Sequence, residues 1–128
     1  HLVAAGIRVS LFIEPVMAGL DAAASIGAPV VELHTGAWCD ALAGDDGERA
    51  SHEFGRLRVA AAYAAQRGLE CHAGHGLDFQ TARRIAELPQ IVELNIGHFL
   101  VGEAIFSGFA TAIQKMRAAM DEGRRHVG

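Results

Sequence analysis

Short apolar runs alternate along the chain with longer segments whose apolar residues recur every three or four positions. A short run of this kind fits a strand, and the three-to-four spacing fits one face of a helix. The expected strands cover residues 9–13, 30–34, 69–72 and 91–96, and the expected helices cover residues 16–26, 48–67, 79–88, 100–106 and 109–122. The pattern predicts four successive strand–helix units, which favours parallel strands joined by right-handed crossovers.

Residues that start and end helices support these boundaries. Glycine follows three of the helices, at Gly27, Gly68 and Gly123, where a helix C-terminus favours it. Asp78 stands where the helix over residues 79–88 needs an N-cap, and Pro89 closes that helix. Residues 35–47 are polar and dotted with glycine, so we expect them to form the longest loop of the chain and a candidate lid.

Two of the expected helices carry an apolar stripe. In the helix over residues 48–67 the stripe consists of Phe54, Leu57, Ala61 and Ala64. In the last helix it consists of Phe109, Ile113, Met116 and Met120. We expect both stripes to belong to the core, because an apolar face at helical spacing packs against the rest of the fold.

Read with a period of two, the strands have one aliphatic and one polar face. Glu32 and His34 share a face of the second strand, and Glu93 and Asn95 share a face of the fourth. The opposite face of the fourth strand would carry Val92, Leu94 and Ile96. A sheet covered on both faces has near-continuous apolar strands, whereas a barrel with a site in its mouth shows this mixture.

A complete (β/α)8 barrel needs about 250 residues, and 128 residues supply half of one. Residues 1–6 also look like the end of a helix whose start is absent. We therefore expect an α/β fold, half of a TIM barrel with parallel strands and outer helices, in which residues 1–128 are a partial single domain. The two outer strands of a half-barrel have open edges, so we expect the isolated chain to self-associate, to aggregate or to require the other half. We also expect a homo-oligomer.

Composition narrows the class of protein. The chain is 51% hydrophobic, which is enough for a core and argues against disorder. Its formal net charge is -4 and no basic cluster stands out, so we expect no nucleic acid partner. No apolar run is long enough to span a membrane, so we expect no membrane partner. Cys39 and Cys71 form no CxxC pair, which favours free thiols in a cytoplasmic protein.

Candidate chemistry lies at two strand ends where glycine stands beside histidine. These are Ala73-Gly74-His75-Gly76-Leu77 and, further along, Glu93-Leu94-Asn95-Ile96-Gly97-His98. Glycine lets the backbone approach a ligand, and free N–H groups near a helix start bind phosphate. A histidine there can exchange protons near neutral pH. The pattern indicates a phosphorylated substrate held beside an imidazole that moves a proton.

With these residues in place, the chain resembles the C-terminal half of the pyridoxine 5'-phosphate synthase family, whose members close the ring of vitamin B6. The resemblance rests on five segments in order and at family-like spacing. They are Val9-Ser10-Leu11-Phe12-Ile13, Gly27-Ala28-Pro29, Glu32-Leu33-His34-Thr35-Gly36, Ala73-Gly74-His75-Gly76-Leu77 and Glu93-Leu94-Asn95-Ile96-Gly97-His98.

The resemblance implies that the four strands are the fifth to eighth of the barrel. It implies condensation of 1-deoxy-D-xylulose 5-phosphate with 3-amino-2-oxopropyl phosphate to pyridoxine 5'-phosphate, inorganic phosphate and water, with no cofactor and no metal. The family's proton donor falls on His75 and its transition-state-stabilising glutamate on Glu32. Its phosphate contacts fall on Gly76, Gly97 and His98. Its two proton-accepting residues, a histidine and a glutamate, would lie in the other half.

The sequence departs from the family pattern at His72, at Trp38-Cys39 and at Glu103, which leaves the fine substrate contacts open. Two alternatives also stay open. The chain could be a catalytically incomplete half-barrel that only binds phosphate or assembles, or part of another phosphosugar barrel enzyme. A class I aldolase is disfavoured, because Lys115, the only lysine, lies on the last expected helix.

Overall fold

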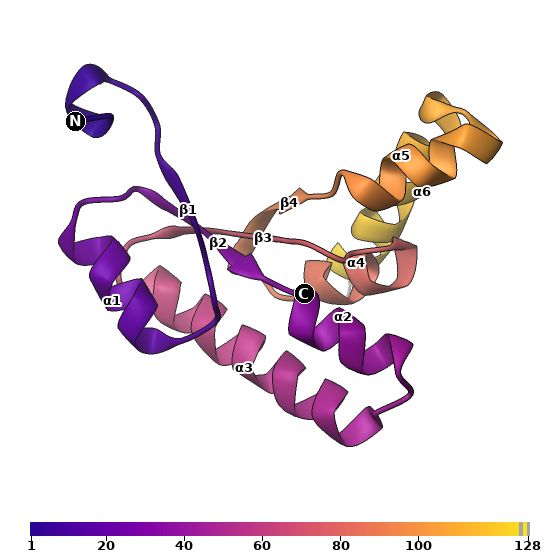
Figure 1. Ribbon diagram of the computed structural model, residues 1–128, viewed down its shortest axis with the longest axis horizontal. Coiled ribbons are helices and arrows are strands. Elements are labelled where there is room, and N and C mark those ends of the chain that lie inside the picture. The colour runs from indigo at the N-terminus through magenta and orange to yellow at the C-terminus, as the bar shows by residue number, and fades with distance from the viewer. Residues whose placement is uncertain (126, 128) are drawn as a thin grey trace.

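The computed structural model describes residues 1–125 and 127, and its centre is a four-stranded parallel sheet in the order β1-β2-β3-β4 (Figure 1). The strands are β1 (Ser10–Ile13), β2 (Val30–His34), β3 (Glu70–Gly74) and β4 (Ile91–Asn95). The helices are α1 (Met17–Ser25), α2 (Gly36–Ala43), α3 (Gly47–Gln66), α4 (Phe79–Ala86), α5 (His98–Ser107) and α6 (Phe109–Arg124). A short 3-10 helix, η1 (Val3–Ala5), precedes β1 and ends at Gly6. The α/β half-barrel expected from the sequence is confirmed in strand number, direction and order.

Register gives the sheet two different faces. One row across the strands joins Phe12 to Glu32, His72 and Glu93, and it is polar except at its β1 end. The neighbouring row on the opposite face joins Leu11, Val31, Cys71 and Ile91. Helices α1, α2 and α3 lie on one side of the strands (Figure 1). The polar and aliphatic faces expected from period-two reading are therefore present.

The core lies between the aliphatic face of the sheet and the helices that cover it. Val31 and Leu33 of β2 are fully buried, and Leu20 of α1 is buried with them. The stripe expected on α3 packs into the same cluster through Leu57, Ala61 and Ala64, with Phe54 partly buried beside them. Truncating one such buried leucine to alanine costs about 2–5 kcal/mol.

The loop and candidate lid expected over residues 35–47 is wrong, because this segment contains helix α2. Its spacing of apolar residues explains the helix, since Trp38 and Ala41 stand three positions apart and are both buried. Burial of this face outweighs the weak helix propensity of the glycines around it. Only a short turn remains before the N-cap Asp46, which accepts a hydrogen bond from the backbone N–H of Arg49 at 3.0 Å and starts α3.

The alternation expected in the fourth strand is broken by an irregularity. Cys71 pairs with Ile91 but His72 pairs with Glu93, so Val92 is an extra residue opposite no partner. Ile91 faces the core and is 2% exposed, whereas Val92 is 62% exposed. The expectation that Val92 shares the aliphatic face with Leu94 and Ile96 is therefore wrong. The extra residue of the bulge breaks the alternation, so residues before and after it no longer follow one period-two pattern.

The C-terminal helices differ from expectation in their ends and in one stripe. Helix α5 begins at His98 and not at residue 100, and α6 continues through Gly123 to Arg124. Gly123 is no stop signal, because it is buried where α6 crosses α4, and a methyl group there would overlap the backbone oxygen of Arg83. Of the expected stripe on α6, Met116 is buried, but Phe109 and Ile113 are exposed.

The other expected helix boundaries agree with the structure to within a few residues. Helix α4 begins after Asp78, whose carboxylate accepts a hydrogen bond from the backbone N–H of Thr81 at 2.8 Å. The hydroxyl of Thr81 in turn accepts from the N–H of Asp78 at 2.7 Å, which completes a capping box. No helix within residues 1–125 and 127 combines the length and apolar character needed to cross a membrane.

Candidate active site

A cavity of about 700 Å³ opens at the carboxyl ends of the strands, where parallel barrels place their sites. The residues that line it are Phe12, Glu32, His75, Gly76, Leu77, Asn95, Ile96, Gly97, His98 and Phe99. All five residues expected to form the site are among them, although they come from three separate segments of the sequence. The structure therefore brings Glu32, His75, Gly76, Gly97 and His98 to one cavity.

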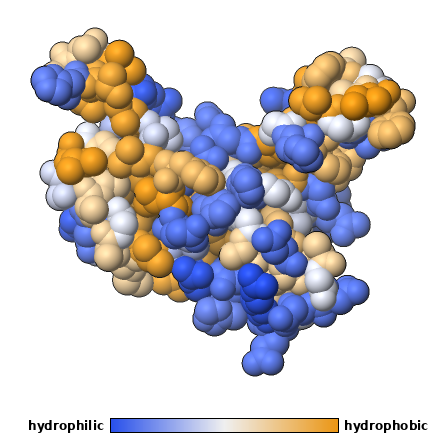
Figure 2. Space-filling model, in the orientation of Figure 1, coloured by the Kyte–Doolittle hydropathy of each residue, from blue (hydrophilic) through white to orange (hydrophobic). Residues whose placement is uncertain are grey.

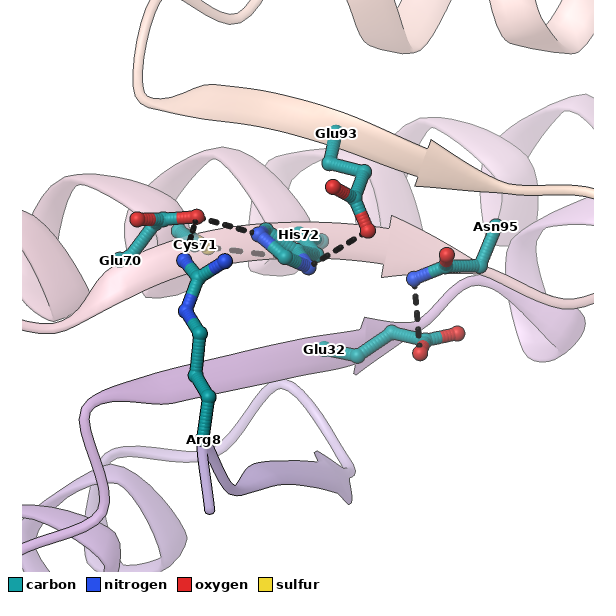
Figure 3. Close-up of polar contacts among 7 residues, drawn as sticks. All are labelled: Arg8, Glu32, Glu70, Cys71, His72, Glu93 and Asn95. Carbon is teal, nitrogen blue, oxygen red and sulfur yellow. Dashed lines mark hydrogen bonds and ion pairs between the residues drawn. The ribbon is translucent and has the colours of Figure 1, made fainter. Parts of the chain in front are cut away.

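Glu32 reaches the cavity from β2 and is held there by an amide. Its Oε2 accepts a hydrogen bond from Asn95 Nδ2 at 2.9 Å (Figure 3). The contact crosses β3, and it is possible because Gly74 has no side chain. A methyl group at position 74 would overlap Glu32 Oε1 and lie 2.8 Å from the backbone oxygen of Asn95.

His75 follows β3 directly and has a backbone that few side chains adopt. Its φ is +79°, in the left-handed region that glycine favours. A non-glycine residue there costs of order 1 kcal/mol or more and persists only where its surroundings hold it. Such outliers gather at functional sites, and of the two non-glycine residues with positive φ in the part of the chain that the structure describes, Asp45 and His75, only His75 lines the cavity.

Thr35 holds the strand end that carries His75. Its side chain is fully buried, and its Oγ1 lies 2.7 Å from the backbone oxygen of Gly74 and 2.5 Å from that of His75. Its backbone N–H also donates to Gly74 O at 2.9 Å. Sequence reasoning missed this role, because a threonine after a strand gives no signal of a contact nearly forty residues away.

Two aromatic side chains lie beside the His75 ring. The rings of His34 and His75 meet edge to face with centroids 4.7 Å apart, and Phe12 contacts His34 in the same way at 5.0 Å. His34 is oriented in turn by Glu14, whose Oε1 lies 2.6 Å from His34 Nδ1. His34 therefore belongs to the surroundings of the site.

Gly97 and His98 form the start of helix α5 at the rim of the cavity. Gly97 is the N-cap of the helix and His98 its first residue, and neither is buried. No side chain caps this end, so backbone N–H groups of the first turn point outward without an intrahelical partner. Together with the helix dipole, such donors suit an anion. Gly76 joins the same cavity from the turn after β3.

His72, one of the departures from the family pattern, lies on the polar face of the sheet and does not line this cavity. It is 4% exposed, and its ring nitrogens lie 2.7 Å from Glu70 Oε1 and 3.3 Å from Glu93 Oε1 (Figure 3). Arg8 pairs with the same Glu70 oxygen. His72 and then Arg8 hold the pKa of the Glu70 carboxyl below its usual value. These side chains therefore pair with one another on the polar face of the sheet, apart from the residues that line the cavity.

The cysteines are poor nucleophiles in this setting. Burial raises the pKa of the Cys39 thiol to about 11 and that of Cys71 to about 12, so both are protonated near neutral pH. Among residues 1–125 and 127, no group of three or more histidine, cysteine, aspartate or glutamate side chains is arranged to hold a metal ion. The chemistry available in the cavity is that of imidazole, carboxylate and amide groups.

Comparison with known proteins shows which family the chain matches. The family described as "Pyridoxal phosphate biosynthesis protein PdxJ" matches residues 1–122. The chain is 62% identical over 128 residues to the pyridoxine 5'-phosphate synthase of Xanthobacter autotrophicus, which covers 100% of this chain and 50% of that protein. It is 60% identical over 121 residues to the synthase of Rhodospirillum rubrum, which covers 94% of this chain and 47% of that protein. The chain therefore spans about half the length of the curated relatives it matches.

Proposed function

The chain belongs to the PdxJ family of pyridoxal phosphate biosynthesis proteins, as its motifs indicated, and from this membership we propose that it is part of a pyridoxine 5'-phosphate synthase. The reaction condenses 1-deoxy-D-xylulose 5-phosphate with 3-amino-2-oxopropyl phosphate. Its products are pyridoxine 5'-phosphate, inorganic phosphate and water. The observation that carries the proposal is the single cavity in which Glu32, His75 and the start of α5 meet.

His75 is the proposed proton donor of the dehydration steps. A hydroxyl leaves readily only as water, so a proton must reach its oxygen as the C–O bond breaks. The imidazole extends from the strand end whose backbone Thr35 holds, and the ring of His34 meets it edge to face at 4.7 Å. A donor placed in the cavity beside the carboxylate of Glu32 is close to where the substrate would lie, which supports this role.

Glu32 is the proposed electrostatic stabiliser. Condensation of an amine with a ketone passes through cationic imine-like intermediates, and a fixed carboxylate lowers the free energy of such a cation. Gly76, Gly97 and His98 are the proposed phosphate contacts, since free N–H groups and the dipole of α5 coincide there.

The complete reaction needs more than these residues. The proton-accepting histidine and glutamate of the family are expected outside this chain, which spans half the length of its relatives. We propose that both halves build one site, that the assembled enzyme is a homo-oligomer, and that it works in the cytoplasm. The two unpaired cysteines support this location, because reduced thiols are usual there.

A chimera tests the proposal. The 128 residues of the Xanthobacter synthase that match this chain are replaced by this chain, and pyridoxine 5'-phosphate is measured after both substrates are added. We expect the product to form at a rate within about tenfold of the parent enzyme. A folded chimera that binds phosphate but makes no product would instead favour the phosphate-binding or assembly alternative.

A further inference from the structure

Asn95 touches Glu32 in the cavity, and we propose that it is a positioning residue for that glutamate: its amide fixes the direction of the carboxylate without neutralising its charge. The inference rests on the proposed function, because it assigns a partner to the group that would stabilise the cationic intermediates. It concerns a residue whose own atoms need not touch the reacting ones.

The contact is built across the sheet. Asn95 ends β4, Glu32 lies on β2, and the strand between them is β3. In register, Asn95 pairs with Gly74, so the one residue that could separate the two side chains has none. Nδ2 of Asn95 reaches Glu32 Oε2 at 2.9 Å, which is a normal hydrogen bond (Figure 3).

The chemical type of the donor fits the proposed task. Within residues 1–125 and 127, Glu32 forms no ion pair, and the hydrogen bond it receives comes from a neutral amide. An arginine or lysine at this place would orient the carboxylate but would also cancel the charge that a cationic intermediate requires. An amide directs one oxygen and leaves the full negative charge in the cavity.

The charged side chains near Asn95 pair with residues other than Glu32, so Asn95 is the residue whose side chain contacts that carboxylate. Glu93, two residues before Asn95 and on the same face of β4, pairs with His72 at 3.3 Å. His72 and Arg8 both pair with Glu70. Glu93 is therefore a matched control: it is a polar residue on the same strand and face that does not contact Glu32.

The test compares Asn95→Ala, Asn95→Asp and Glu93→Gln in the chimera with the Xanthobacter half. A lost hydrogen bond to a charged group corresponds to about a tenfold or greater fall in kcat, so we expect that fall in both Asn95 variants, with KM for each substrate within about threefold. In Asn95→Asp the new carboxylate repels the old one, so the acid limb of the pH–rate profile moves to higher pH. Glu93→Gln should leave kcat and that limb unchanged.

The results distinguish a failure of the inference about Asn95 from a failure of the proposed function. If Glu32→Gln abolishes turnover while Asn95→Ala and Asn95→Asp match the parent chimera, the inference fails and the proposed function stands. If the unaltered chimera makes no product, the proposed function fails, and the Glu32 carboxyl is then titrated by carbon-13 NMR. A shift of that titration to higher pH in Asn95→Ala, which loses the amide donor and adds no charge, supports the inference, and an unmoved titration overturns it. Should Asn95→Ala not fold, Asn95→Leu, which is close to asparagine in volume, gives the same readout.

Discussion

At the scale of single residues, the contact between Glu32 and Asn95 depends on Gly74. Glu32 and Asn95 approach each other over its Cα, in space that any side chain would fill. Glycine is required here by the close approach of its neighbours and not by its own backbone angles, since its φ is not positive. One methyl group added at residue 74 should therefore lower activity in a chain that still folds.

We predict that Gly74→Ala lowers kcat in the chimera by at least about tenfold, because the methyl group forces Glu32 out of its hydrogen bond with Asn95. The measurement is steady-state turnover, with circular dichroism to establish folding. The matched control is Gly55→Ala on α3, where a methyl group meets nothing within 4 Å. That control should keep full activity and gain up to about 1 kcal/mol in stability from helix propensity. Equal activity in both variants would contradict the geometry.

At this scale, a site residue could be predicted from the sequence only where the residues next to it carry a recognisable pattern. His75 follows Gly74 and His98 follows Gly97, both at strand ends, and Glu32 is marked by the alternation of its own strand, so each could be found without a structure. The roles of Thr35 and Asn95 come from contacts with residues nearly forty or more positions away. The pattern of a single segment cannot predict such a contact, because the two residues come together only when the strands pair in the sheet.

At the scale of elements, a helix or strand could be predicted where its own residues show a clear period. Strands and long helices carry their own period, and they were placed to within a few residues. Helix α2 was missed because its eight residues are too short for a clear period and include glycine. The bulge at Val92 was missed because an alternating pattern does not say which residue has no partner.

The start of α5 gives a prediction about anions. Titration of the chimera with inorganic phosphate should shift the backbone amide resonances of Gly97 and His98 more than those elsewhere on α5. The reason is that their N–H groups and the positive end of the helix dipole lie together at the cavity rim. Nitrogen-15 NMR measures the shifts, with chloride at the same ionic strength as the control. Shifts confined to another part of the chain would place phosphate elsewhere.

The crossing of α4 and α6 gives a prediction about stability. Gly123→Ala should lower the free energy of unfolding by about 1–3 kcal/mol, because its methyl group overlaps the backbone oxygen of Arg83 and lies 3.0 Å from Ala86 Cβ. Helix propensity alone favours alanine, so the sign of the effect distinguishes packing from propensity. Urea denaturation gives the measurement. Gly102→Ala on α5, where nothing lies within 4 Å, should be neutral or stabilising.

At the scale of the whole molecule, the sheet has two outer strands and large apolar side chains at its surface. β1 and β4 each have one neighbour, so each offers unpaired backbone groups along its other edge. Exposed apolar residues gather over the N-terminal segment and over α5 (Figure 2). They include Leu2, Val3 and Ile7 at one end and Val101, Ile105 and Phe106 at the other. A strand edge beside apolar surface favours pairing with another chain.

We predict that the 128-residue chain by itself sediments as a species larger than a monomer and lacks synthase activity. Val92→Lys places a charge on the outer strand β4 at a residue that is 62% exposed, so it should reduce the association without disturbing the core. Sedimentation velocity measures both variants. A monomer that unfolds cooperatively would mean that the edges associate with nothing, and a monomer that makes product would show that no further residues are needed.

The most direct test of the proposed reaction is the turnover of His75→Asn in the chimera. We expect kcat for pyridoxine 5'-phosphate formation to fall by on the order of a hundredfold or more, the usual contribution of one general acid, with KM for both substrates nearly unchanged. His52→Asn, on an exposed histidine of α3, is the control and should match the parent. An unchanged kcat with a raised KM would assign His75 to substrate binding and contradict its role as proton donor.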